Sequence, residues 1–200
     1  MRKAIIDVIN MSWPTVVIVV CILSIMRIAI QFNSRSGKRF ILYEEILNLL
    51  FIIYLMVLFK LVTSQDLPGG GTNFIPFSEI TRYKYGTNGF FKQVFGNILL
   101  FIPLGYFLTK YCKIKRAGGL ILMSLLSSLS IEVVQHFIGR SFDIDDVILN
   151  VSGAIIGFII YKFLKLIREK LPKFLNKDWF YNLLALLFVA IIILFLIKIL

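Results

Sequence analysis

Apolar residues along this chain occur in six long runs that are separated by shorter polar stretches. The runs cover residues 15–32, 46–62, 94–111, 118–138, 147–167 and 179–200. Each is close to the roughly 20 residues that a helix needs to cross a hydrocarbon core of about 30 Å. The runs are apolar on every side, whereas a membrane-spanning strand alternates apolar and polar residues over about ten positions. The pattern therefore predicts an all-α, polytopic integral membrane helix bundle of about six transmembrane helices, with five as the alternative.

The composition supports a membrane protein and excludes an ordinary water-soluble fold. Of the 200 residues, 58% are hydrophobic and 16% are charged, and the mean hydropathy is +0.87. Soluble domains are about 45–50% apolar and about 25% charged, so this chain lacks the polar surface to cover itself in water. The formal net charge of +11 does not require a nucleic-acid partner, because cytoplasmic loops of membrane proteins are rich in Lys and Arg.

The placement of Lys and Arg predicts which way the spans point. The connections after the first, third and fifth runs contain 13 of the 22 Lys and Arg residues. By the positive-inside rule these connections face the cytoplasm. The long 63–93 loop and the short 139–146 loop then lie on the extracytoplasmic side. We divide the chain into an N-terminal helical hairpin (1–64), a core of outer loop and three spans (65–168) and a C-terminal span (169–200).

The long outer loop contains an apolar pentapeptide, Asn73-Phe-Ile-Pro-Phe77. Three glycines after Pro68 precede it and give this part of the loop the composition of a turn. The pentapeptide is apolar enough either to dip into the membrane interface or to pack on the helix bundle, and the sequence leaves both open.

Acidic residues are scarce, and four of the eleven lie close together around the turn between the fourth and fifth runs. They are Glu132, Asp143, Asp145 and Asp146. A charged side chain within a span costs roughly 2.5–3.5 kcal/mol or more, so a buried one usually has a partner or a function. This cluster is therefore the first candidate site.

Glu132 and Gln135 are three positions apart, so both side chains lie on one face of their helix. Exposure of Glu132 to lipid would be costly, and we expect this face to point into the bundle. The pair serves either as a helix-packing hydrogen bond or as a ligand or proton site, and the neighbouring acids favour the second.

Asp143, Asp146 and Asn150 form one stripe at the start of the fifth run, with the spacing i, i+3 and i+7. Asp143 is placed to cap this helix, with Asp146 at the third helical position as in a capping box. The stripe continues as Gly153 and Gly157, a small-residue motif that permits close helix packing. We expect this face to pack on the fourth span, which brings Asp146 and Asn150 toward its Glu–Gln pair.

Other polar and small residues extend the candidate site. Arg140 either supplies a cation to the acids or is a solvated loop charge, and Asn97 begins the third span at the same level. Pro103 is expected to interrupt that helix, with Gly105 after it, which frees main-chain carbonyls. The lone histidine, His136, lies off the acidic face, and the serines of the fourth run are expected to bond back to their own helix.

These motifs together resemble the VanZ family of bacterial membrane proteins. The matching pieces are Asn73-Phe-Ile-Pro-Phe77, Asn97-Ile-Leu-Leu-Phe-Ile-Pro-Leu-Gly105, Glu132-Val-Val-Gln135 and Arg140-Ser-Phe-Asp-Ile-Asp-Asp-Val-Ile-Leu-Asn150-Val-Ser-Gly153, ending at Gly157. Their order and approximate spacing agree with the family over about residues 73–161. Val151 departs from the family pattern, in which a Thr is common after the Asn, and this puts a polar role at that turn in doubt but not packing.

The resemblance implies an association with lower susceptibility to teicoplanin and other lipoglycopeptides, without altered peptidoglycan precursors. We expect the site to be an outward-facing polar cluster between spans three, four and five of a bacterial cytoplasmic membrane protein. The expected partners are membrane lipids and either the antibiotic or a lipid-linked cell-wall intermediate. No cofactor, metal or nucleic acid is expected.

The candidate residues fall into two groups. The functional candidates are polar and lie near the outer face: Asn97, Glu132, Gln135, Arg140, Asp143, Asp146 and Asn150. The supporting candidates shape the loop and the helix packing: Asn73, Pro76, Phe77, Pro103, Gly105, Gly153 and Gly157.

Two other functions remain open. Glu132, Asp143 and Asp146 could serve an intramembrane enzyme that acts on a lipid-linked cell-wall intermediate, as acid and base or as ligands of Mg²⁺. The chain has no nucleophile elbow, H-E-x-x-H motif or phosphate-binding glycine loop, which weighs against an enzyme. A transporter or flippase could use Glu132 as a proton-coupled carboxylate, although no inverted repeat is visible.

Overall fold

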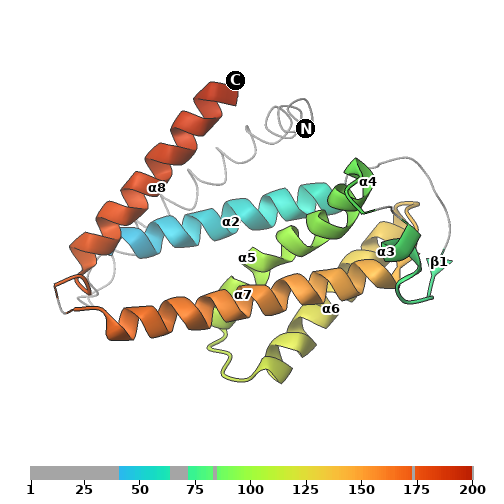
Figure 1. Ribbon diagram of the computed structural model, residues 1–200, viewed down its shortest axis with the longest axis horizontal. Coiled ribbons are helices and arrows are strands. Elements are labelled where there is room, and N and C mark those ends of the chain that lie inside the picture. Colours follow the sequence, from blue (N-terminus) through green and yellow to red (C-terminus); the bar gives the residue numbers. More distant parts are fainter. Residues whose placement is uncertain (1–40, 64–71, 83–84, 173, 200) are drawn as a thin grey trace, which may run out of the picture. The chain divides into compact units, whose positions relative to one another are not determined.

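The computed structural model of the chain describes residues 41–63, 72–82, 85–172 and 174–199. Four helical segments in this part are long and apolar enough to cross a membrane: α2 (Leu42–Thr63), the segment Gln93–Tyr111 that contains α5 (Gly96–Tyr111), α6 (Ala117–Phe137) and α7 (Ile144–Lys170) (Figure 1). A further helix, α8 (Asp178–Ile199), contributes a shorter apolar stretch, Asp178–Ile191. The protein is thus all-α in its long elements and a multi-pass membrane protein.

Four of the six predicted spans are present as long apolar helices. α2 contains the run 46–62, α6 matches 118–138 to within one residue at each end, and α7 extends 147–167 by three residues at each end. The first predicted span, 15–32, lies outside the described residues. The last, 179–200, corresponds to α8, so the number of six spans is supported only in part.

The chain divides into two compact units. Unit 1 combines Met1–Val57 with Leu171–Leu200, and unit 2 is Leu58–Lys170. Within unit 1, the main-chain N–H of Tyr43 in α2 donates to Oδ1 of Asn182 in α8 at 2.9 Å. The Tyr43 ring centroid also lies 5.3 Å from that of Tyr181. A polar and an aromatic contact therefore join the start of α2 to the start of α8.

The core of unit 2 is the packing of α7 on α5, where two glycines let the backbones meet. A Cβ atom at Gly153 would lie 2.2 Å from the carbonyl oxygen of Ile98, and one at Gly157 would lie 2.1 Å from that of Ile102. The prediction that this glycine face packs on the fourth span, α6, is therefore wrong, since both glycines face α5. A small-residue motif permits close approach but does not specify the partner helix.

The helix α5 is continuous through Pro103, which corrects the expected interruption there. Irregular backbone occurs earlier, in the π-helical turn η1 (Phe91–Phe95) that leads directly into α5. Gly105 also packs on α7, because a Cβ atom there would lie 2.1 Å from the carbonyl oxygen of Ala154. This part of α5 thus contributes to helix packing.

The outer loop folds onto the start of α7. The short strands β1 (Thr72–Asn73) and β2 (Phe142–Asp143) pair in parallel, with Thr72 opposite Phe142 and Asn73 opposite Asp143. Helix α3 (Ser78–Arg82) contacts α7, and α4 (Asn88–Phe90) leads into η1. Figure 1 shows β1 and α3 at the end of unit 2 where α6 ends and α7 begins.

The serines of α6 follow the expected back-bonding with one exception. The hydroxyls of Ser124, Ser127 and Ser130 donate to main-chain carbonyls three or four residues earlier, at 3.1, 2.9 and 2.8 Å. Ser128, which is fully buried, instead accepts a hydrogen bond from α7. Small hydroxyl residues therefore allow α6 to lie against α7 and provide one polar contact between them.

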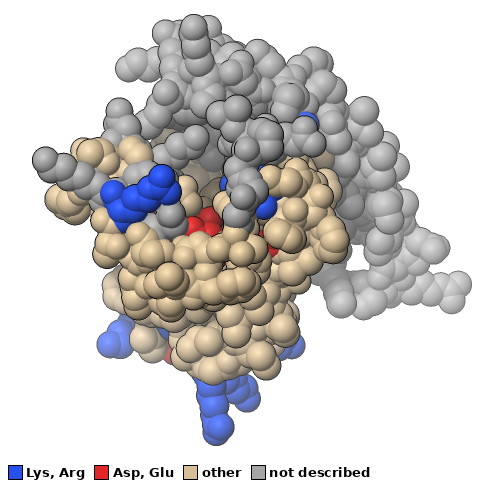
Figure 2. Space-filling view, turned by 90° about the vertical axis from the view of Figure 1, so that its right-hand side faces the viewer, with Lys and Arg blue, Asp and Glu red and all other residues tan. Residues whose placement is uncertain are grey.

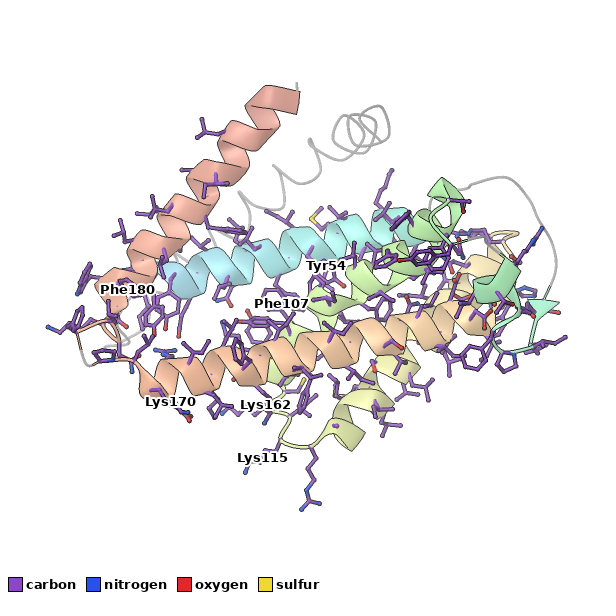
Figure 3. All side chains as sticks on the ribbon, in the orientation of Figure 1. Tyr54, Phe107, Lys115, Lys162, Lys170 and Phe180 are labelled. Carbon is purple, nitrogen blue, oxygen red and sulfur yellow. The ribbon has the colours of Figure 1, made fainter. Side chains whose placement is uncertain are left out.

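Basic residues gather toward the other end of α7. Nζ of Lys162 donates to the main-chain oxygen of Lys115 in the α5–α6 connection at 3.3 Å. Nζ of Lys165 lies 3.9 Å from the carboxylate of Glu169 one turn later. Figure 3 shows Lys115, Lys162 and Lys170 away from β1 and α3. This separation of basic and acidic ends within unit 2 agrees with the predicted topology, and the side of the membrane stays a prediction.

Candidate functional site

The connection from α6 to α7 begins with a glycine turn that positions Arg140. The N–H of Arg140 donates to the carbonyl of Gln135 at 2.9 Å, and that of Gly139 donates to the carbonyl of His136 at 3.1 Å. These two bonds form a Schellman motif, which ends many helices. Gly139 has a φ of +88°, in the left-handed region that glycine adopts without strain. The turn brings Arg140 back beside Gln135.

Glu132, Gln135 and Arg140 form a hydrogen-bonded relay. In the amide orientation that satisfies both neighbours, the Gln135 amide nitrogen donates to Oε1 of Glu132 at 3.1 Å. The Gln135 amide oxygen accepts from Nη1 of Arg140 at 2.9 Å. Glu132 is 1% exposed and Gln135 is buried, whereas Arg140 is half-buried. A buried carboxylate therefore holds a guanidinium at the end of α6 through one amide.

Asp143 caps α7 and joins it to two other elements. Its Oδ1 accepts from the main-chain N–H of Asp145 at 2.9 Å, as an N-cap residue does, and from Nδ2 of Asn73 in β1 at 3.0 Å. The main-chain N–H of Asp143 donates to Oε2 of Glu132 at 3.1 Å. The predicted cap is confirmed. The carboxylate that completes the capping box, however, comes from Glu132 on α6 and not from Asp146.

Asp145 is an acid that the candidate set omitted, and it is 1% exposed. Its Oδ1 accepts from the main-chain N–H of Phe77, and its Oδ2 accepts from that of Ile80 at 3.1 Å. Hydrogen bonds to an ionised carboxylate are stronger than those between neutral groups. Asp145 thus fixes the outer loop to the first turn of α7. In the sequence, Asp145 belongs to the acidic cluster around the turn between the fourth and fifth runs. It does not lie on the helix face that Asp143, Asp146 and Asn150 share, and the predicted site residues of this helix come from that face.

Asp146 turns toward α5. Its Oδ1 accepts from Nε2 of Gln93 at 2.9 Å and from Nδ2 of Asn97. Gln93 and Asn97 are four positions apart and lie on one face across the junction of η1 and α5. Asp146 lies near enough to Glu132 for their charges to interact, but its hydrogen bonds go to α5. Gln93 is not one of the residues that the sequence analysis selected. Its position four residues before Asn97, on the same helix face, is the signal that could have indicated it.

Asn150 lies one turn further along α7, and its Nδ2 donates to Oγ of Ser128 at 2.9 Å. Both side chains are buried. Asn150 therefore approaches α6 as expected, but its partner is a serine and not the Glu–Gln pair. The bond has the character of a polar contact between packed membrane helices.

Most of the candidate residues come together around the start of α7. Figure 2 looks onto this end and shows atoms of Asp and Glu residues, with Lys or Arg atoms close to them. The polar network comprises Asn73, Gln93, Asn97, Glu132, Gln135, Arg140, Asp143, Asp145 and Asp146. Phe77 joins it through its main chain, and Pro76 lies exposed beside it. The other supporting candidates, Pro103, Gly105, Gly153 and Gly157, belong to α5 and α7 further along.

The network is a set of hydrogen-bonded carboxylates with one guanidinium beside them. Within the described residues, no group of three His, Cys, Asp or Glu side chains is arranged to hold a metal ion. The set of Glu132, Asp143 and Asp146, considered above as magnesium ligands, is accordingly not gathered around one point. Arg140 is the cationic residue of the polar network, and the N–H donors of its guanidinium suit an anionic group.

Comparison with known proteins identifies the family. The model of the VanZ/LLP1 family matches residues 40–165. The match includes α2 and so begins well before Asn73, where the resemblance by motifs starts. No curated protein and no solved structure matches the chain. Because the family match covers more than half of the 200 residues, the chain belongs to the VanZ/LLP1 family.

Proposed function

We propose that this chain lowers the susceptibility of a bacterium to teicoplanin and related lipoglycopeptides, and that it acts through the polar network at the start of α7. Membership of the VanZ/LLP1 family supports the resistance role. The observation that carries the site is the Glu132–Gln135–Arg140 relay. The network binds an anionic polar group at the extracytoplasmic surface, which belongs to a lipid headgroup, a lipid-linked cell-wall intermediate or the antibiotic.

Helix packing alone does not explain the Glu132–Gln135–Arg140 relay. Burying an ionisable side chain such as that of Glu132 between helices is costly, and a polar contact between helices needs no ionisable group, as Asn150 and Ser128 illustrate. Here the carboxylate orients the Gln135 amide, whose oxygen then holds Arg140. A guanidinium carries five N–H donors in a planar fork that matches carboxylate and phosphate groups. The Gln135 oxygen accepts a hydrogen bond from one N–H group of Arg140. We assign the remaining N–H groups of this guanidinium to the ligand.

The surroundings of Arg140 suit an amphiphile. Arg140 lies just past the end of α6, a membrane-spanning helix whose outward side chains are mostly apolar, with Ser130 and His136 as the polar exceptions. Leu122, Leu126 and Phe137 on this helix are exposed, and Phe137 in its last turn is 84% exposed. A molecule with an acyl or prenyl chain places that chain among the lipids along α6 while its polar head reaches the guanidinium.

The test is the susceptibility of a teicoplanin-sensitive Gram-positive host that expresses the wild type, Arg140→Gln or Arg168→Gln. Arg168 lies in the last turn of α7, at the end opposite the network, so its substitution is a matched loss of one arginine charge. The minimal inhibitory concentration of teicoplanin is measured at equal amounts of each protein in the membrane. Vancomycin, which has no lipid tail, is measured in parallel.

We expect the wild type and Arg168→Gln to raise the inhibitory concentration of teicoplanin several-fold over the empty vector, and Arg140→Gln to return it to the vector level. A wild type without effect contradicts the resistance role. Full protection by Arg140→Gln contradicts the site while leaving the resistance role in place.

A further inference from the structure

The segment Phe74–Phe77 presents four consecutive apolar residues outward beside the polar network. The side chains of Phe74, Ile75 and Phe77 are 67%, 70% and 57% exposed, and Pro76 is exposed as well. The one ring contact of this segment with the described residues is that of Phe74 with Phe142, at 5.3 Å between centroids. Runs of exposed apolar residues of this kind mark an interaction surface.

The main-chain N–H groups of Ile75 and Phe77 in this segment find their acceptors within the protein itself. The N–H of Ile75 donates to Oδ1 of Asn73 at 3.1 Å, and those of Phe77 and Ile80 donate to the two carboxylate oxygens of Asp145. Main-chain N–H groups that leave water must find partners within the protein, because lipid offers none. The proline between Ile75 and Phe77 has no N–H to satisfy. The N–H groups of Ile75 and Phe77 thus have the internal acceptors that they need outside water.

We propose that Phe74–Phe77 is a membrane-interface anchor, whose apolar side chains insert among the lipids of the leaflet where α6 ends and α7 begins. The occupant of this surface is the bilayer itself. Asp145 on α7 and the β1–β2 pairing hold the anchor rigidly to the spanning helices. This proposal does not depend on the proposed antibiotic function.

The position and chemistry of the segment favour lipid as its partner. It lies at the same end of unit 2 as the last turn of α6, where Phe137 continues the lipid-facing surface of a spanning helix (Figure 1). Segments that lie in the membrane interface bury Trp, Phe and Leu side chains at the boundary between headgroups and acyl chains. No charged residue occurs from Thr72 to Phe77. Because the segment is not regular helix, it lies at the interface and not in the hydrocarbon core. The polar network beside it is then at the depth of the lipid headgroups.

The test measures the depth of a nitroxide label at position 75 in the full chain. Ile75→Cys is made in a chain whose own two cysteines are replaced by alanine (Cys21→Ala and Cys112→Ala), and the labelled protein is reconstituted in vesicles of phosphatidylethanolamine and phosphatidylglycerol. Power-saturation electron paramagnetic resonance then compares collisions with oxygen, which partitions into lipid, and with a water-soluble nickel chelate. Leu122→Cys on the outward face of α6 is the lipid reference, and Glu169→Cys at the basic end of α7 is the aqueous reference.

We expect the label at position 75 to favour oxygen over nickel, with a ratio closer to that at 122 than to that at 169. A ratio like that at 169 places the segment in water and overturns the proposal. Low accessibility to both reagents means that protein covers the segment, and this result overturns it as well.

A second measurement uses the wild-type chain and so does not depend on a substituted protein folding. A lipid bearing a photoreactive diazirine on its acyl chain near the headgroup is activated in the same vesicles, and labelled peptides are identified by mass spectrometry. We expect adducts on Phe74–Phe77. Adducts on the spanning helices with none on this segment contradict the anchor.

Discussion

The main-chain N–H of Asp143 donates to Oε2 of Glu132 at 3.1 Å, so a carboxylate from α6 completes the cap at the start of α7. The other oxygen of Glu132 accepts from the Gln135 amide, which in turn accepts from Arg140. One buried carboxylate therefore performs two tasks. It locks the helix connection, and it positions the guanidinium that we assign to ligand binding.

Replacing Glu132 with alanine should destabilise the protein markedly. The change leaves two buried donors, the N–H of Asp143 and the Gln135 amide, without their acceptor, at a cost of about 1–3 kcal/mol each. Thermal unfolding in detergent, followed by size-exclusion fluorescence, measures the loss. Glu169→Ala is the control, because its exposed pairing with Lys165 contributes about 0.5 kcal/mol or less. Equal unfolding midpoints for the two variants would show that Glu132 carries no structural role.

Substitution of Gly157 with alanine should separate α7 from α5. The new methyl group would lie 2.1 Å from the carbonyl oxygen of Ile102, so the two backbones must move apart, at a cost of about 1–3 kcal/mol or more. Gly96→Ala, at the first residue of α5, is the control. Its methyl group meets nothing within 4 Å, and alanine gains up to about 1 kcal/mol in helix propensity over glycine. A Gly157→Ala protein as stable as Gly96→Ala contradicts the close packing.

The Asp145→Asn variant should loosen the outer loop while leaving the spanning helices folded. An asparagine has a single carbonyl oxygen, and its amide group would face the second main-chain N–H, so either Phe77 or Ile80 loses its acceptor. Hydrogen exchange followed by mass spectrometry should show amides of residues 77–81 exchanging about tenfold faster, which corresponds to roughly 1.4 kcal/mol. Asp178→Asn, in the first turn of α8, is the control. Unchanged exchange in the loop argues that Asp145 does not hold it.

Changing Gly139 to alanine tests the turn that carries Arg140. No neighbour lies within 4 Å of a Cβ atom there, so the effect comes from the φ of +88° alone and should cost about 1–2 kcal/mol. Gly139→Asn should cost less, because asparagine tolerates the left-handed region better. Unfolding midpoints in the order glycine, asparagine, alanine support the turn. An alanine variant equal to the wild type speaks against it.

The sequence was informative where a property repeats over many residues. Long apolar runs predicted α2, α6 and α7 to within a few residues, since crossing a bilayer sets both their length and their composition. The cap of Asp143 was predictable for a related reason, because it depends on neighbours in the chain. The candidate residues also gathered near one end, since the turn between the fourth and fifth runs is short.

Contacts between segments far apart in the sequence were not predictable in the same way. The partner of Gly153 and Gly157 was misassigned to α6, because a small-residue face fits any helix that offers a close surface. The role of Asp145 is not visible in the sequence, because its partners are main-chain N–H groups of the outer loop, which have no signature in the side-chain pattern. Pro103 lies inside α5 without ending it. The general rule that a proline interrupts a helix therefore gave the wrong prediction at this position.

The central claim is that a buried relay holding Arg140 gives protection against teicoplanin, and its most direct measurement is the inhibitory concentration conferred by Glu132→Gln. This variant keeps the size of the side chain, but its amide group competes as a donor for the Gln135 oxygen that holds Arg140. Glu169→Gln, an exposed change of the same kind, is measured beside it at equal membrane amounts. We expect Glu132→Gln to lose protection and Glu169→Gln to keep it. Full protection by Glu132→Gln would show that the relay does not act in resistance.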